Sequence, residues 1–155
     1  QSIITDAVEG VERLFEQPAF TDVVGVSFVD VGELVGASLA AESVSVDAPP
    51  EITLIWRGFG DTERDYTVFV QLLSPDGQVI AQSDSPPMMG QRPTSGWVAG
   101  EYILDTHTLR FNLPEYQGDA TVIAGLYDPA DFQRVRTMDD ADAAQLPLLL
   151  EVTGE

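Results

Sequence analysis

The segment SDSPPMMGQRPTSGW, residues 83–97, holds the side chains of this sequence that are best suited to binding a sugar. An aromatic ring can stack on the apolar C–H face of a pyranose, and Trp97 closes the segment. Three polar side chains that can bond sugar hydroxyl groups precede it: Asp84, Gln91 and Arg92. These four residues form the candidate ligand site, with Trp97 as its platform.

The same residues have a structural interpretation, which we favour. Trp97 would fold back to plug the edge of the core, and three prolines would make the segment a stiff crossing between two sheets. The tyrosines that would extend a sugar platform would instead fill the core with their hydroxyls at the surface: Tyr66, Tyr102, Tyr116 and Tyr127. Both interpretations stay open, and Trp97 is the best single ligand candidate.

His107 is the only histidine, so a pair of histidines cannot share a metal within one chain. Alternation turns it inward with Leu109, and Asp105, two residues earlier, lies on the same face. A catalytic dyad also needs a nucleophile, for which Ser85 or Ser95 would have to serve, and there is no G-x-S-x-G elbow. We favour a core or edge histidine that is hydrogen-bonded to a neighbour.

Carboxylates are abundant, but none of them forms a recognisable catalytic or metal-binding pattern. GDTERDY (60–66) places acidic residues at alternate positions, as a Ca²⁺ loop does, but its spacing is not that of an EF-hand and Arg64 opposes a cation. The cluster in MDDADAAQ (138–145) is equally loose, and no pair of carboxylates stands out as a glycosidase acid and base. Solvated loop charge is the preferred interpretation, and no metal or cofactor is expected.

Short segments with a period of two must position these groups. Turns follow two of them, at 74–78 and 128–133. No helix separates the strands, so we expect an all-β fold: an antiparallel β-sandwich, Ig-like or jelly-roll-like, over 21–155, with about eight or nine strands. The expected strands are 23–31, 33–40, 52–56, 65–73, 78–83, 101–105, 107–113, 120–128 and 147–152.

The first 20 residues read as a lead-in with a short N-terminal helix. TDAVEGVERLFEQP (5–18) offers Thr5 or Asp6 as the N-cap, and Glu9 completes a capping box with Asp6. Apolar residues recur on one side at helical spacing, and Pro18 ends the pattern.

Acidic residues dominate the charge: 26 Asp and Glu stand against seven arginines and no lysine, for a net charge of −19. This charge repels phosphate backbones and anionic headgroups, so neither nucleic acid nor an anionic membrane surface is an expected partner. It leaves cations, neutral sugars and basic protein patches. The absence of cysteine excludes disulfides, thiolate catalysis and zinc–sulfur sites. No apolar run approaches the roughly 18 residues of a membrane span.

A set of motifs between residues 50 and 130 carries a family resemblance. They are Trp56, RDYTVFVQLLSPDGQVIAQSDSPP (64–87), Gly90, PTSGW (93–97), GE (100–101), DTHTL (105–109) and AGLYDP (124–129), with a weaker match in ELVGASL (33–39). Together they resemble an extracytoplasmic β-sandwich domain at the C-terminal ends of bacterial multi-spanning membrane glycosyltransferases, similar to dolichyl-phosphate-mannose-protein mannosyltransferases. The catalytic acidic residues of such enzymes lie in their membrane portion, so the resemblance carries no catalytic residue to this chain.

The leading hypothesis is therefore a non-catalytic accessory domain of a membrane or cell-surface protein, located outside the cytoplasm. Its expected partners are a glycan or a membrane-protein parent chain, with Ca²⁺ a less favoured ligand. The first alternative is a carbohydrate-binding module that uses loop aromatics around Trp97. The second is a hydrolase with an unrecognised carboxylate pair. Fold alone does not choose among the three.

Overall fold

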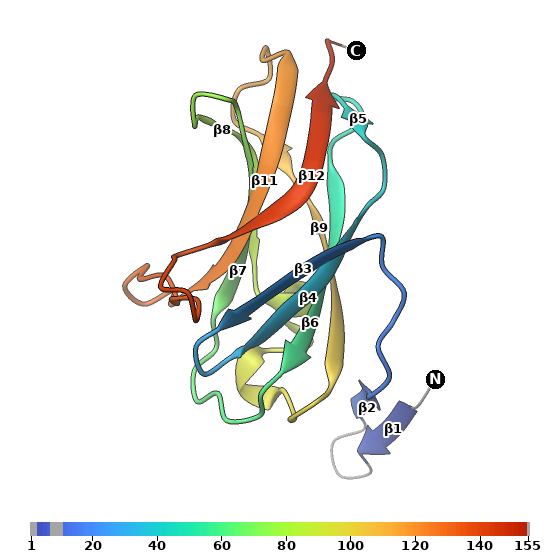
Figure 1. Cartoon of the computed structure of the whole chain (residues 1–155), viewed down its shortest axis with the longest axis vertical. Helices are drawn as coiled ribbons and strands as arrows, with labels where there is room; N and C mark the ends of the chain where they lie inside the picture. The colour runs from blue at the N-terminus through green and yellow to red at the C-terminus, as the bar shows by residue number, and fades with distance from the viewer. Residues whose placement is uncertain (1–2, 7–10, 155) are drawn as a thin grey trace.

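Two sheets of β-strands lie face to face in the computed structural model, which describes residues 3–6 and 11–154 (Figure 1). In spatial order, the first sheet contains β1 (Ile3–Asp6), β2 (Val11–Leu14), β9 (Tyr102–Thr108), β6 (Glu51–Gly58), β4 (Gly32–Leu39) and β3 (Asp22–Phe28). The second contains β10 (Arg110–Phe111), β8 (Val79–Ser85), β7 (Thr67–Leu73), β11 (Gly118–Tyr127), β12 (Ala144–Val152) and β5 (Ser43–Val44). Neighbours pair antiparallel, except that β5 pairs parallel with β12. The predicted all-β sandwich is confirmed.

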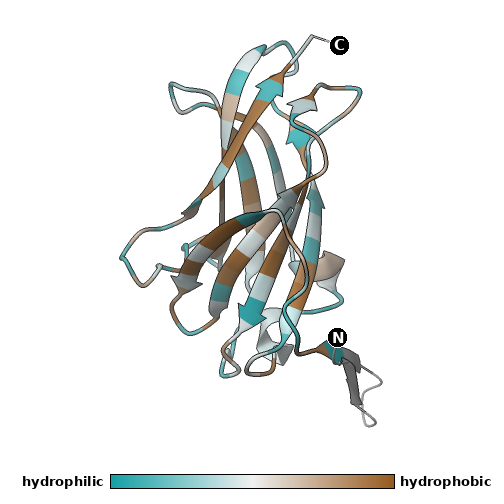
Figure 2. Cartoon of the chain, turned by 45° about the vertical axis from the view of Figure 1, so that its right-hand side comes forward, coloured by the Kyte–Doolittle hydropathy of each residue, from teal (hydrophilic) through white to brown (hydrophobic). Residues whose placement is uncertain are grey.

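The core lies between the sheets because each strand turns alternate apolar residues inward. β12 shows the pattern cleanly: five inward residues from Ala144 to Val152 are buried, and the four between them are exposed. Figure 2 shows the same alternation as brown and teal bands along the strands. Phe28 and Trp56 meet edge to face within this core, with ring centroids 5.6 Å apart. Burial of this apolar area is the main term that drives the sheets together.

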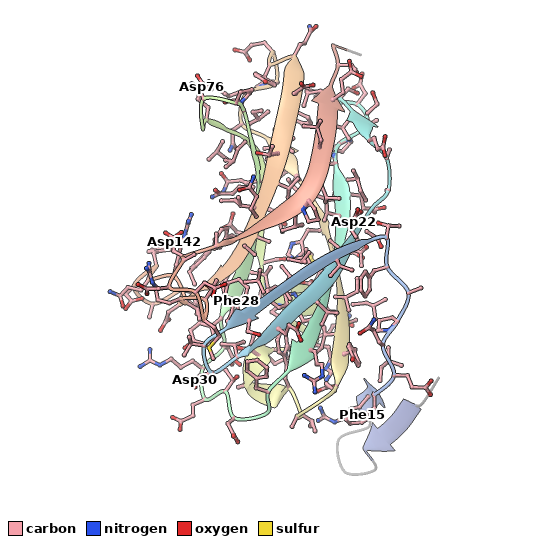
Figure 3. All side chains as sticks on the ribbon, in the orientation of Figure 1. Phe15, Asp22, Phe28, Asp30, Asp76 and Asp142 are labelled. Atoms are coloured by element: carbon pink, nitrogen blue, oxygen red, sulfur yellow. The ribbon has the colours of Figure 1, made fainter. Side chains whose placement is uncertain are left out.

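Acidic side chains lie around this core rather than in it, with the exceptions discussed below. Figure 3 labels Asp22, Asp30, Asp76 and Asp142, which lie at strand ends or in loops around the outside of the sandwich. Charge at such positions remains hydrated, so a high net negative charge is compatible with the fold. Among the described residues, no helix is both long and apolar enough to cross a bilayer.

The predicted N-terminal helix over 5–18 is wrong. Thr5 and Asp6, the proposed caps, lie in β1, while Glu9 falls outside the described residues. β2 pairs antiparallel with β1 and continues to Leu14, which pairs with Tyr102 of β9. The β1–β2 hairpin therefore extends the edge of the first sheet beside β9, which is distant in sequence. Such tertiary pairing overrides the weak helical preference of this segment.

The segment 83–97 begins as the end of β8 and then crosses to the other sheet, as the structural interpretation predicted. Beyond Ser85 it contains two 3₁₀ turns, η1 (Pro87–Gly90) and η2 (Thr94–Gly96), before reaching β9. β8 belongs to the second sheet and β9 to the first, so this loop closes one side of the sandwich. The two turns therefore determine which side chains fill the space between β8 and β9.

Candidate functional site

Trp97 is a core residue in this structure. Its side chain is only 2% exposed, its ring centroid lies 5.9 Å from that of Trp56, and its Nε1–H donates to the Arg92 carbonyl at 2.9 Å. A Cβ atom at Gly58 would lie 2.9 Å from the Trp97 Cβ, so glycine is needed for this close approach. The indole presents no open face for a sugar. The interpretation of Trp97 as a sugar platform is therefore wrong, and the alternative, in which Trp97 plugs the edge of the core, agrees with the structure.

The three polar residues predicted beside Trp97 do not gather around it. Arg92 turns its guanidinium to the buried Glu101 carboxylate, 2.5 Å away. Gln91 is exposed on the crossing loop, and Asp84 is exposed on β8. Of the predicted ligand site, only Asp84 lines a cavity described below.

A cleft of about 770 Å³ opens where β8 and β10 of one sheet approach β9 of the other. This β8–β9 cleft falls within the roughly 300–1,000 Å³ that is usual for small-molecule sites. Its walls combine amides, hydroxyls and charged groups with two apolar side chains, Phe111 and Met89. The full lining is Gln82, Ser83, Asp84, Ser85, Met89, Thr106, His107, Thr108, Arg110, Phe111 and Asn112.

A three-residue hydrogen-bond relay lies at the floor of the β8–β9 cleft. The His107 Nδ1 atom lies 2.9 Å from the Ser83 hydroxyl, and its Nε2 atom lies 2.7 Å from the Asp105 carboxylate. His107 and Asp105 are buried, whereas Ser83 is partly exposed. If Nε2–H donates to Asp105, Nδ1 is left as the acceptor for the Ser83 hydroxyl. The predicted inward His107, hydrogen-bonded to a neighbour, is confirmed.

Asp105 also fastens the crossing loop to the cleft. Its carboxylate accepts the Met88 N–H at 2.8 Å and the Trp56 Nε1–H at 3.4 Å. Met88 and Met89 both take left-handed backbone angles, with φ of 53° and 57°. Side chains of this size rarely adopt that conformation, so the turn depends on anchors such as this one.

The serine in the relay is Ser83, and not Ser85 or Ser95, the two that the sequence suggested as a nucleophile. Ser85 lines the cleft, but the two ring nitrogens of His107 are bonded to Ser83 and Asp105, and the Ser95 N–H donates to Asp65 at 3.1 Å. Ser83 reaches His107 because β8 and β9 face each other across the two sheets. Alternation along the strand places Ser83 on the same inward face as Ala81, but this pattern does not identify which strand of the other sheet lies opposite.

A chain of side-chain hydrogen bonds runs along the rim of the cleft. The Asn112 amide donates to Gln82 at 2.8 Å, and the Gln82 amide donates to Asp84 at 2.7 Å. Asp84 also lies beside Tyr127 at the next hollow. Burial raises the pKa of the Tyr127 hydroxyl, and the neighbouring Asp84 raises it further. The rim therefore leads from β10 across β8 to the end of β11.

Beyond Asp84, an aromatic patch lies on the outer face of the second sheet. We call it the Tyr127 patch; it comprises Phe69, Gln71, Asp84, Tyr127, Phe132 and Arg134, around a hollow of about 240 Å³. Ring centroids are 6.2 Å apart for Phe69 and Tyr127, and 5.7 Å apart for Tyr127 and Phe132. The Arg134 guanidinium covers the Phe69 ring, 4.2 Å from its centroid. Phe132 is the outermost ring and is 74% exposed.

The β11–β12 loop holds Phe132 in this exposed position. The Phe132 N–H donates to the Asp128 carbonyl at 2.7 Å, and the Gln133 N–H donates to the Asp131 carboxylate at 3.0 Å. The Ala130 N–H donates to the Asp128 carboxylate at 2.9 Å and lowers its pKa, and Arg64 lowers it further. Phe132 itself has a φ of 62°, which is costly for a bulky side chain. The fold therefore orders a strained loop that leaves a large ring in solvent.

The acidic clusters show no metal-binding arrangement. Within residues 3–6 and 11–154, no three histidine or carboxylate side chains gather closely enough to hold an ion. In the GDTERDY segment, Asp65 accepts the Ser95 N–H, and Arg64 pairs with Asp128 at 2.5 Å. These groups therefore connect loops to one another.

Comparison with known proteins reveals a likeness of fold. The sequence matches no family model and no curated protein. The structure is similar to the crystal structure of the C-terminal domain of Wzt, with a TM-score of 0.53 over 92% of this chain and 83% of that one. The two sequences are 13% identical. A likeness at that level of identity shows a shared β-rich fold, and the function must be argued from the site.

Proposed function

We propose that this chain is a non-catalytic, glycan-binding β-sandwich domain that serves a membrane or cell-surface protein outside the cytoplasm. The observation that carries the proposal is the lining of the β8–β9 cleft. Sugar hydroxyls both donate and accept hydrogen bonds, so they suit a wall of amides, hydroxyls and a carboxylate. The rim chain Asn112–Gln82–Asp84 supplies such groups, and the Ser83 hydroxyl, which the buried His107 orients, supplies another at the floor.

Other features agree with this choice of ligand. Phe111 and Met89 give the cleft an apolar contribution that matches sugar C–H groups. The net charge of −19 favours a neutral glycan over an anionic one, because like charges repel. The resemblance of residues 50–130 to domains of membrane glycosyltransferases, and the fold shared with a terminal domain of another protein, support an accessory role.

Titration calorimetry with a panel of neutral mono- and oligosaccharides tests the proposal. At least one neutral saccharide should bind, and Gln82→Ala or Asn112→Ala should each lower its affinity about fivefold, as expected for the loss of one hydrogen bond of about 1 kcal/mol. Gln145→Ala, an exposed amide on β12 away from the cleft, is the matched control. If no saccharide binds, or if Gln82→Ala binds as well as Gln145→Ala, the proposal fails.

The Ser83–His107–Asp105 relay favours a second candidate, a serine-dependent acyl hydrolase. Ser83 would be the nucleophile, His107 the general base and Asp105 the group that orients it. We rank it second because Asp105 is also committed to the crossing loop and because Ser83 lies within a regular strand instead of a sharp turn.

A serine-reactive fluorophosphonate probe distinguishes the two candidates. A hydrolase would be labelled covalently at Ser83, and Ser83→Ala would abolish the labelling. Ser85→Ala, which alters a second serine of the same cleft, is the control. A protein that binds saccharide but takes no label supports the binding domain alone.

A further inference from the structure

The β8–β9 cleft and the Tyr127 patch adjoin at a single residue. Asp84 lines both cavities, with the rim amide of Gln82 on one side and the Tyr127 hydroxyl on the other. Across the sheet, Asp84 pairs with Phe69, and Phe69 pairs with Gly125. A Cβ atom at Gly125 would lie 2.7 Å from the Phe69 ring, so glycine allows this ring to lie flat on the sheet. The hydrogen-bonding rim and the aromatic row therefore form one continuous surface.

We propose that the ligand is an extended neutral oligosaccharide that runs across β8, with one end in the cleft and another sugar ring stacked on Phe132. This inference rests on the proposed glycan-binding function and specifies the length and path of the ligand. The hollow of the Tyr127 patch, about 240 Å³, is below the usual range for an independent small-molecule site. The cleft, at about 770 Å³, is within that range. The patch is therefore an extension of the cleft.

Phe132 has the properties of a stacking platform. Its ring is 74% exposed and is supported from behind by Tyr127, so it offers apolar area without first having to become ordered. Burying a ring that the strained loop keeps in water would recover hydrophobic free energy on binding. Asp84 and Gln71 lie in the same patch and can bond the hydroxyls around a stacked sugar ring.

Binding along a length series tests this path. The probes are linear gluco-, manno- and galacto-oligosaccharides of one to six rings, titrated by calorimetry into the whole chain. Affinity should rise at least tenfold between the shortest and the longest member of the series that binds. Phe132→Ala should remove this rise while changing the affinity for the shortest member less than twofold, and Phe132→Trp should retain it.

Two controls separate failure of the path from failure of the function. Met138→Ala alters another exposed side chain of the β11–β12 loop, 69% exposed, and should leave the length series unchanged. If Gln82→Ala weakens all binding but Phe132→Ala leaves the longest oligosaccharide unaffected, the path is overturned and cleft binding stands. If no member of the series binds the unaltered chain, both the path and glycan binding are overturned.

Discussion

The Arg13 guanidinium of β2 lies 2.7 Å from one carboxylate oxygen of Glu101, and the Arg92 guanidinium lies 2.5 Å from the other. Glu101 is fully buried, and its carboxylate also accepts the Val98 N–H at 2.7 Å. The N-terminal hairpin and the crossing loop are therefore joined at one buried charge immediately before β9. A carboxylate can be buried in this way because charged and backbone donors surround it.

Removing that carboxylate should be costly. Glu101→Ala leaves two guanidinium groups facing each other with little solvent access, and we expect a loss of about 3 kcal/mol in the free energy of unfolding. Urea denaturation measures the loss. Arg136→Ala, which breaks an exposed pair with Asp140, is the control and should cost about 0–1 kcal/mol. Equal losses for the two variants would show that the Glu101 cluster contributes no more than a surface pair.

The ion pairs of Arg13 and Arg92 with Glu101 explain why the sequence predicts the sandwich but not the conformation of the N-terminal segment. Inward alternation is a local pattern, so 147–152 indicated a strand directly. The segment 107–113, predicted as one strand, is instead divided between the end of β9 and β10 of the other sheet. Arg13 and Glu101 are 88 residues apart, and local spacing cannot reveal such a partner. Without it, the apolar spacing around Val11 and Phe15 favoured a helix.

Trp97 provides a test of the corrected site. Trp97→Ala should destabilise the domain by about 3–5 kcal/mol, because it leaves a cavity beside Trp56. The guanidinium denaturation midpoint should fall accordingly, while Trp97→Phe should cost less. Saccharide affinity measured well below the melting temperature should change little. A stable Trp97→Ala variant that had lost saccharide binding would restore Trp97 as a ligand residue.

The candidate site could be predicted only in part, for a physical reason. Parity along one strand placed His107 inward on the same face as Asp105, and the structure confirms this arrangement. Ser83 and His107 come from different sheets, and Phe132 lies in a turn that the sequence marks only as a turn. Which strands face each other, and which way a loop ring points, depend on packing of the whole chain.

Titration of Tyr127 should report its proximity to Asp84. Burial and Asp84 raise the pKa of Tyr127 above the usual value of about 10, so the neutral hydroxyl is favoured in the folded state. This contribution to stability is complete below pH 10 and is lost as the pH rises through the folded-state pKa. Ultraviolet difference spectra should show one tyrosine ionising late, and Tyr127→Phe should remove it. Asp84→Asn should shift its ionisation to lower pH; an unchanged titration would argue against the Asp84 contact.

Phe132 should contribute more to binding than to stability. Its left-handed backbone costs about 1 kcal/mol, which asparagine largely avoids, whereas loss of the ring contact with Tyr127 costs about 0.5–1.5 kcal/mol. These terms nearly cancel, so the free energy of unfolding of the Phe132→Asn variant should lie within about 1 kcal/mol of that of the unaltered chain. Phe132→Ala keeps the strain but loses the ring, and it should be the less stable of the two variants. Thermal melts rank the variants, and both should lose the affinity gained with longer oligosaccharides. A loss above about 3 kcal/mol for Phe132→Asn would instead mark Phe132 as a packing residue, since losses of that size follow from emptying a core position.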